Sequence, residues 1–302
     1  MSAPLPSSSP PEAAEGAEGP AGPERRVRLA GVDLDPLTLR GTIELMLGAL
    51  DAGRGGWLVT SNLDHLRRAG HDPSFRAMLA AADRVVADGM PLVWASRIAG
   101  TPLPERVAGS TLSAEMAAAA AARGRSLFLL GGNPGVADAA AARLREDHPD
   151  LVIAGTHCPP LGFEDDPEAA PALRAALASS DADLVYVALG SPKQEKLIAE
   201  LRGEGLLPGA WWVGVGISLS FLCGEVSRAP GWVQAAGLEW VHRLAQEPRR
   251  LARRYLVDGL PYAARLLAAA AWSRLTRPAA ATFRPAEASG AAPPAPGPGA
   301  DA

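Results

Sequence analysis

Short runs of apolar residues recur along the middle of the chain and alternate with longer segments of mixed polarity. Such runs, bounded by small or polar residues, are typical of strands that are buried on both faces. The longer segments carry apolar positions at helical spacing, as residues 134–147 and 167–179 do. Strands are therefore expected at residues 57–60, 84–87, 127–130, 151–154, 184–189 and 211–215.

The alternation of strands and helices predicts an α/β fold, with a mostly parallel, Rossmann-like sheet and helices on both of its faces. In such sheets ligands collect at the carboxyl ends of the strands, where loops and helix amino termini expose unpaired N–H groups. The residues that follow each apolar run are therefore the first candidates for chemistry.

Polar side chains follow the first two expected strands, at Thr60-Ser61-Asn62 and at Asp88-Gly89. A carboxylate at the end of a strand suits a general base, because the loop leaves it partly desolvated and within reach of a substrate. The same residues also fit helix caps and turns, with Asp88 capping a helix that starts near Pro91. Spacing alone leaves both interpretations open.

Two further strand ends carry candidate binding residues. Gly131-Gly132-Asn133-Pro134-Gly135 is a strand-to-helix turn whose N–H groups can approach a phosphate, although it lacks the GxGxxG spacing and also fits a tight turn with positive φ. Residues 190–196 place Lys193, Gln194 and Glu195 at a helix entrance, where they could hold hydroxyls and a phosphate or simply decorate the surface.

Composition divides the chain into four parts. Residues 1–24 and 278–302 are rich in Pro, Ala, Gly and Ser, and we expect both to be disordered tails. Between them we expect a core at 25–227 and an appendage at 228–277. The first tail lacks the pattern of a secretory signal, and no segment has the ~18–20 strongly apolar residues of a membrane-spanning helix.

Charge and cysteine content narrow the function classes. A formal net charge of -4 argues against a generally basic nucleic-acid-binding protein. The two cysteines, Cys158 and Cys223, can form neither a disulfide framework nor a four-thiolate zinc site, which fits the reducing cytoplasm.

The appendage is locally basic, with Trp, Tyr and Leu interleaved among its arginines. Such a segment is typical of a membrane-surface element, in which arginines meet lipid phosphates. A solvated helix that packs its leucine face on the core is the alternative. The arginines expected to contact the membrane are Arg249, Arg250, Arg253 and Arg254.

Several short motifs occur in order between Val27 and about Tyr262: Thr60-Ser61-Asn62, Ala82-Asp83 leading to Asp88-Gly89, Glu105-Arg106-Val107-Ala108-Gly109, Gly131-Gly132, Gly190-Ser191-Pro192-Lys193-Gln194-Glu195, Gly214-Val215-Gly216, Arg228-Ala229-Pro230, Leu238-Glu239-Trp240 and Glu247-Pro248-Arg249. Together they resemble the WecG/TagA/CpsF family of bacterial glycosyltransferases. The resemblance implies transfer of an N-acetylmannosamine-type or related sugar from a UDP donor to a polyprenyl-diphosphate-linked acceptor. This reaction belongs to the synthesis of cell-surface polysaccharides such as teichoic acid or exopolysaccharide.

The resemblance also assigns roles by position. Asp88 takes the place of the catalytic base, and Thr60 stands with it in the catalytic set. Arg106 would neutralise a diphosphate. The other expected substrate contacts are Asn62, Gly131, Gly132, Gln194, Glu195 and Ser220. The appendage corresponds to the family's membrane-targeting tail, so we expect a peripheral protein on the inner face of the cell membrane.

The departing UDP needs a metal ion or cationic groups around its diphosphate. The two Asp-x-Asp pairs are poorly placed for a metal, because Asp33-Leu-Asp35 falls in an expected amino-terminal turn and Asp181-Ala-Asp183 precedes a strand. We therefore expect a reaction without metal or cofactor, which inverts the anomeric configuration because a single base drives an in-line attack.

Two positions depart from the family pattern. Ser220 stands where an acidic residue usually follows the Gly-Val-Gly motif, and Cys158-Pro159-Pro160-Leu161-Gly162-Phe163 replaces the usual Gly-Tyr-Phe-like loop. Both departures bear on the identity of the sugar donor more than on the class of reaction.

Two other functions fit parts of the sequence. A nucleotide-binding oxidoreductase could use the same sheet, although the turns at Gly131 and Gly214 lack the dinucleotide pattern. A non-catalytic scaffold could use the basic appendage alone. The sequence leaves the oligomeric state open, a homo-oligomer included.

Overall fold

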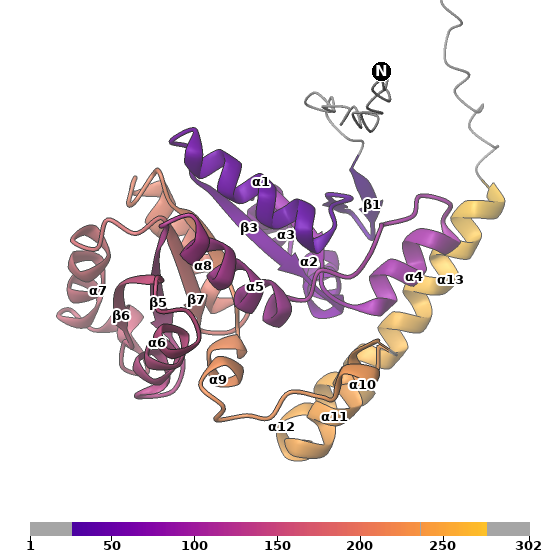
Figure 1. The fold of residues 1–302 in the computed structure, drawn as a ribbon. Helices are drawn as coiled ribbons and strands as arrows, with labels where there is room; N and C mark the ends of the chain where they lie inside the picture. The colour runs from indigo at the N-terminus through magenta and orange to yellow at the C-terminus, as the bar shows by residue number, and fades with distance from the viewer. Residues whose placement is uncertain (1–25, 236, 277–302) are drawn as a thin grey trace, which may run out of the picture.

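The computed structural model describes residues 26–276 with the exception of residue 236 (Figure 1). The two segments expected to be disordered tails, 1–24 and 278–302, lie outside the described residues. The described chain forms an α/β core and a helical carboxyl-terminal appendage. The predicted fold class is therefore confirmed.

A six-stranded sheet, in the order β4-β3-β8-β7-β5-β6, forms the centre of the core, and all its neighbouring strands are parallel. All six expected strands are present, with ends that differ by a few residues. They are β3 (Gly56–Ser61), β4 (Arg84–Ala87), β5 (Ser126–Gly131), β6 (Val152–His157), β7 (Leu184–Ala188) and β8 (Trp211–Gly214).

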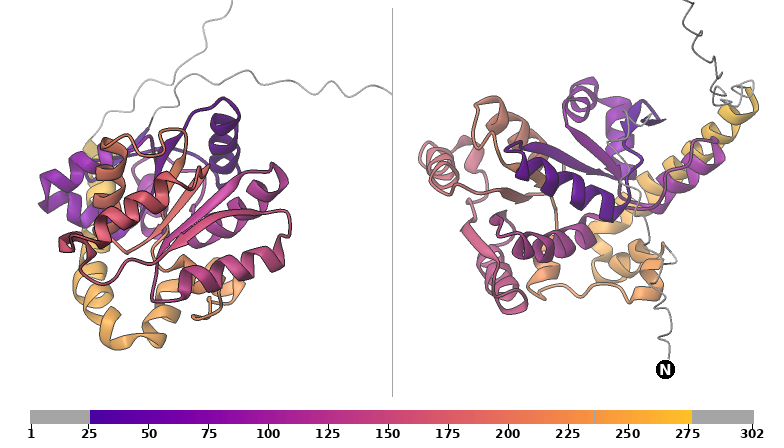
Figure 2. Two further views of the ribbon diagram at one scale, coloured as in Figure 1. Left: turned by 90° about the vertical axis from the view of Figure 1, so that its left-hand side faces the viewer. Right: turned by 45° about the horizontal axis from the view of Figure 1, so that its top comes forward.

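Helices cover both faces of the sheet (Figures 1 and 2). Alternate side chains of each strand enter one of two apolar clusters, as Trp57 and Val59 enter one and Leu58 the other. The cluster around Leu58 packs on α1 (Leu39–Asp51), α5 (Gly109–Ala122), α6 (Val136–Asp147) and α9 (Ser218–Leu222). The opposite cluster packs on α2 (Leu63–His71), α3 (Pro73–Ala80), α4 (Met90–Ile98), α7 (Ala169–Ala178) and α8 (Lys193–Gly203). A short 3-10 helix, η1 (Phe163–Asp165), precedes α7.

A small hairpin precedes α1, where we had expected only a turn. Its strands are β1 (Val27–Leu29) and β2 (Val32–Leu34), and they pair antiparallel. Asp35 fixes the hairpin to β4, because its backbone N–H donates to the Val85 carbonyl and its Oδ2 accepts from the Val85 N–H, both at 2.7 Å. The first Asp-x-Asp pair is thus a structural element of the fold.

The appendage consists of α10 (Gly231–Ala235), α11 (Glu239–Gln246), α12 (Pro248–Ala252), the π-helical η2 (Arg253–Gly259) and α13 (Leu260–Thr276). Figures 1 and 2 show α13 lying along α4, and its Leu266 and Ala270 are buried in the core cluster. The predicted helical character of the appendage is confirmed. Among the described helices, none combines the length and apolarity needed to cross a bilayer.

Candidate active site

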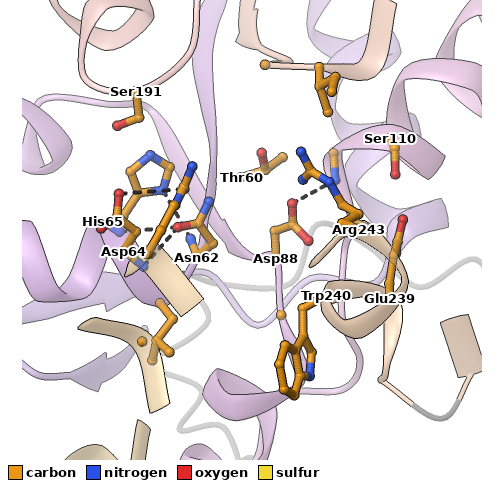
Figure 3. A pocket seen from close by; sticks show the side chains of 18 of the residues that line it. Thr60, Asn62, Asp64, His65, Asp88, Ser110, Ser191, Glu239, Trp240 and Arg243 are labelled. Carbon is orange, nitrogen blue, oxygen red and sulfur yellow. Dashed lines mark hydrogen bonds and ion pairs between the residues drawn. The ribbon is translucent and has the colours of Figure 1, made fainter. Parts of the chain in front are cut away.

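A cavity of about 390 Å³ lies where the carboxyl ends of β3, β4, β7 and β8 face the appendage. Its core side is formed by the residues that follow these strands and by the loop before α5, and its other side by α11, α12, η2 and the start of α13. Of the residues predicted from the sequence, those that line it are Thr60, Asn62, Asp88, Arg106, Gln194, Arg250 and Arg254 (Figure 3 labels some of them).

Asp88 follows β4 and points into the cavity (Figure 3). Its Oδ2 accepts a hydrogen bond of 3.2 Å from the backbone N–H of Gly109, the first residue of α5. Gly89 has a φ of 144°, so a side chain there would strain the turn that leads into α4. Since α4 has no side-chain cap, the expected capping of that helix by Asp88 is wrong, and the carboxylate serves the start of α5 instead.

Burial sets the proton affinity of Asp88. Desolvation raises the pKa of this carboxyl above its usual value, and the nearby Glu239 raises it further. The Gly109 N–H and the Arg106 guanidinium oppose the shift without cancelling it. A carboxylate with a raised pKa is a stronger base, and the structure therefore gives Asp88 the property that proton abstraction requires.

Thr60 lies beside Asp88 at the end of β3 and is buried. A Cβ added to Gly109 would lie 3.0 Å from Thr60 Oγ1 and 3.6 Å from Asp88 Oδ2. The hydroxyl of Thr60 and the carboxylate of Asp88 therefore both border the space beside Gly109 at the start of α5. That space stays open because Gly109 has no side chain. The structure brings together the two residues predicted to form the catalytic set.

Asn62 caps α2. Its side-chain oxygen accepts from the N–H groups of Asp64 at 3.0 Å and His65 at 3.2 Å. In return, Nδ1 of His65 accepts from the backbone N–H of Asn62 at 3.1 Å. The capping interpretation is confirmed for Asn62, and because its oxygen is used by the helix, only its amide NH2 group is left for a ligand.

A buried network joins three strand ends beneath the cavity. Since Nδ1 of His65 is an acceptor, its Nε2 carries the proton and donates to Glu195 Oε1 at 3.2 Å. Gln194 Nε2 donates to the same oxygen at 2.8 Å, and Gln194 Oε1 accepts from the N–H groups of Gly190 and Gly216. Desolvation opposes ionisation of Glu195, but the hydrogen bonds from His65 and Gln194 hold its pKa below the usual range.

This network changes the interpretation of two predicted contacts. Glu195 is 2 % exposed and is not among the residues that line the cavity, so it acts on the site through His65 and Gln194. Gln194 does line the cavity, but its oxygen already holds two loops together. The remaining N–H of Gln194 is the part of its amide that a ligand could use.

Arginines line the cavity from both sides, two from the core and three from the appendage. Arg254 of η2 lies 3.6 Å from Asp64 of α2, which ties the appendage to the core. Burial opposes ionisation of Asp64, but Arg254 and Arg67 hold the pKa of this carboxyl below its usual range. Arg249 and Arg253 are exposed and are not among the cavity residues. The cavity arginines are Arg67, Arg106, Arg243, Arg250 and Arg254.

Gly131, Gly132 and Ser220 are not among the residues that line this cavity. Both glycines have positive φ, 93° and 85°, as a tight turn requires, and the Gly132 N–H donates to the Ala188 carbonyl at 2.9 Å. Ser220 lies on α9 next to Glu225, and hydrogen bonds from Ser220 and Asn133 hold the pKa of Glu225 below its usual range. A carboxylate thus stands beside Ser220 despite the departure noted in the sequence.

Comparison with known proteins identifies the family. The model of the Glycosyl transferase WecG/TagA/CpsF family matches residues 27–276. The chain belongs to this family. One relative, from Bacillus spizizenii (strain ATCC 23059 / NRRL B-14472 / W23), is an N-acetylglucosaminyldiphosphoundecaprenol N-acetyl-beta-D-mannosaminyltransferase. It is 34% identical over 205 residues, which are 68% of this chain and 76% of the relative.

Membership of the WecG/TagA/CpsF family confirms the resemblance inferred from the motifs and makes the protein a glycosyltransferase. The oxidoreductase and the non-catalytic scaffold are not favoured. The roles assigned to individual residues stay predictions, and the geometry of the cavity is the evidence on which they now rest.

Both Asp-x-Asp pairs of this transferase have structural partners. Besides the contacts of Asp35, Asp183 accepts hydrogen bonds from the backbone and side chain of Ser126 at the amino end of the sheet. Within residues 26–276 as described, no three His, Cys, Asp or Glu side chains are grouped so that they could hold a metal ion. The metal-independent reaction stays a prediction.

Several residues that line or support the cavity were not predicted from the sequence. His65 follows the cap residue by one helical turn, and this capping-box spacing is the signal that could have revealed it. Glu239 and Trp240 belong to the motif Leu238-Glu239-Trp240, which supported the family resemblance but predicted no role for either side chain. The contact of Arg243 with the ring of Phe221, at 5.9 Å, depends on tertiary packing and leaves no local signal.

Proposed function

We propose that this protein transfers an N-acetylmannosamine-type sugar from a UDP donor to a polyprenyl-diphosphate-linked acceptor, with inversion at the anomeric carbon. The observation that carries the proposal is the Asp88 carboxylate, which lies in the cavity beside Thr60 and has a raised pKa. The printed name of the Bacillus spizizenii relative supports the choice of donor sugar and acceptor.

In this proposal Asp88 removes the proton from the acceptor hydroxyl as that oxygen attacks the anomeric carbon. The bond from this carbon to the diphosphate oxygen breaks, and UDP leaves with the bonding electron pair. The Thr60 hydroxyl lies next to the carboxylate and can orient the attacking hydroxyl. A single base on one side of the sugar accounts for inversion.

The cavity arginines stabilise the negative charge that develops on the departing diphosphate. A guanidinium is always charged and can bind two phosphate oxygens at once. Arg106 comes from the loop before α5, whereas Arg250 and Arg254 come from the appendage. Core and appendage would therefore both contribute to the binding of diphosphate groups.

The acceptor lipid implies a membrane surface. We propose that the protein binds peripherally to the inner face of the cell membrane through the appendage, with Arg249 and Arg253 toward lipid phosphates. All four arginines are exposed, but only Arg250 and Arg254 line the cavity. The four arginines would then serve two different anionic surfaces, the membrane and the substrate diphosphate.

The direct test is a transfer assay with the purified full-length protein, UDP-N-acetylmannosamine and a short-chain polyprenyl diphosphate that carries N-acetylglucosamine. We expect one sugar to be added to the acceptor, one UDP to be released, and the anomeric configuration of the product to be opposite to that of the donor. Failure to transfer sugar from any of a panel of UDP-N-acetylhexosamines and uronates would contradict the proposal.

A further inference from the structure

Glu239 is the carboxylate that the appendage brings to the cavity. It is the first residue of α11, and its side chain is 14% exposed. Its two oxygens reach different arginines: Oε2 lies 3.4 Å from Arg106 Nη1, and Oε1 lies 3.6 Å from Arg228 Nε. One carboxylate therefore bridges a core loop and the start of the appendage.

The two arginines need this bridge. Arg106 and Arg228 are mostly enclosed by protein, with exposed fractions of 17% and 26%. Two guanidinium groups that share one small region repel each other unless an anion lies between them. Arg228 is held from its other end by Thr111 of α5, whereas Glu239 is the carboxylate paired with Arg106 among the described residues.

Several charged groups face Asp88 from the elements packed around it. Arg106 comes from the loop before α5, Glu239 and Arg243 from α11, and His65 from α2. Arg106 favours the charged form of Asp88, and Glu239 opposes it directly and also by occupying Arg106. Loss of the Glu239 charge would therefore make Asp88 a weaker base.

We propose that Glu239 is a positioning residue for sugar transfer, which fixes Arg106 at the cavity wall and prevents it from neutralising the Asp88 carboxylate. This inference rests on the proposed function and adds a residue of the appendage to its machinery. Because Glu239 holds Arg106, the arginine stays oriented before the substrate arrives. The anionic diphosphate of the substrate would then bind Arg106 on the side that Glu239 leaves free.

The test compares Glu239→Gln with Glu204→Gln. Glu204 follows α8 and pairs with the surface Arg174 at 2.7 Å, so its substitution removes an arginine-paired carboxylate away from the cavity. We expect Glu239→Gln to lower kcat/KM by about 10- to 100-fold, as a displaced catalytic group does, and Glu204→Gln to leave it unchanged.

The pH profile of kcat/KM separates positioning from a general loss of structure. In Glu239→Gln we expect the acid limb to move to lower pH, because Asp88 loses a neighbouring negative charge and becomes more accessible to Arg106. Glu239→Asp, which keeps the charge, should keep the acid limb of the wild type. Thermal melting of each variant confirms that it is folded.

Two outcomes would overturn the role of Glu239, and a third would refute the proposed function on which it rests. A wild-type rate and pH profile in Glu239→Gln would show that the bridge has no role in transfer. Complete loss of transfer in Glu239→Gln together with wild-type transfer in Asp88→Asn would make Glu239 the base. Absence of transfer by the wild-type protein, despite UDP binding in a direct titration, would instead refute the proposed donor and acceptor.

Discussion

At the scale of single residues, the raised pKa of Asp88 is the property that the proposed chemistry requires. The sequence predicted its place at a strand end, because short apolar runs followed by polar residues mark such ends reliably. It did not predict the Gly109 hydrogen bond, which joins positions far apart in the chain. For the same reason Glu195 was taken for a substrate contact, although it is buried against His65.

The first residue-scale prediction concerns activity and pH. A general base must be unprotonated, so transfer should fall as the pH drops through the pKa of Asp88. Because burial raises that pKa, the acid limb of kcat/KM should lie above the usual titration range of an aspartate. The profile should be measured with saturating acceptor, and an acid limb at or below the usual range would contradict the assignment.

The second residue-scale prediction concerns stability. A carboxyl whose pKa is raised by folding binds protons more tightly in the folded state, so its charge costs stability at neutral pH. That cost begins to shrink as the pH falls through the raised pKa, and it vanishes only below the usual pKa of the unfolded chain. Asp88→Asn mimics the protonated form and can still accept from Gly109. We expect the variant to melt at the same temperature as the wild type or higher at pH 7, with the difference shrinking under acid conditions. A large drop at pH 7 would show that Asp88 has a structural role instead.

At the scale of elements, the sheet could be predicted and the contacts between its loops could not. The six strands stood out because each contains a short apolar run, although the edge strand β6 is partly exposed. The strands β1 and β2 were missed because runs of three residues carry too little pattern. Gln194 connects the loops after β7 and β8, and this contact depends on the absence of a side chain at Gly214.

The element-scale prediction tests that contact. In Gly214→Ala the new Cβ would lie 2.6 Å from Gln194 Nε2, so Gln194 must move and release the Gly190 and Gly216 N–H groups. We expect a loss of about 1–3 kcal/mol in the free energy of unfolding, together with reduced transfer. Gly203→Ala is the control, since nothing lies within 4 Å of its Cβ. Equal denaturation midpoints for the two variants would contradict the role of Gln194.

At the scale of the whole molecule, the appendage closes the cavity that the strand ends leave open. Its helical, basic nature was visible in the sequence, but its position was not. That position depends on the pairs Arg106–Glu239 and Asp64–Arg254 and on the packing of α13 along α4. These contacts connect residues separated by more than a hundred positions, and the pattern of a single chain contains no signal for them.

The whole-molecule prediction concerns the membrane. Arg249→Glu with Arg253→Glu reverses two exposed charges outside the cavity. We expect binding to anionic liposomes to fall by roughly tenfold or more at low salt, with a smaller effect at high salt because salt screens the attraction. The matched control, Arg143→Glu with Arg145→Glu, makes the same charge change on α6. Equal sedimentation of the two double variants with liposomes would refute electrostatic binding through the appendage.

The central claim is that the Asp88 carboxylate drives the transfer. It is tested most directly by a single-turnover measurement of sugar transfer, with enzyme in excess over the lipid-linked acceptor, for the wild type and for Asp88→Asn. Since the amide cannot accept the acceptor's proton, the account predicts a rate about 10²–10⁴-fold lower in a variant that still binds UDP. A folded Asp88→Asn variant that transfers sugar at the wild-type rate would contradict it.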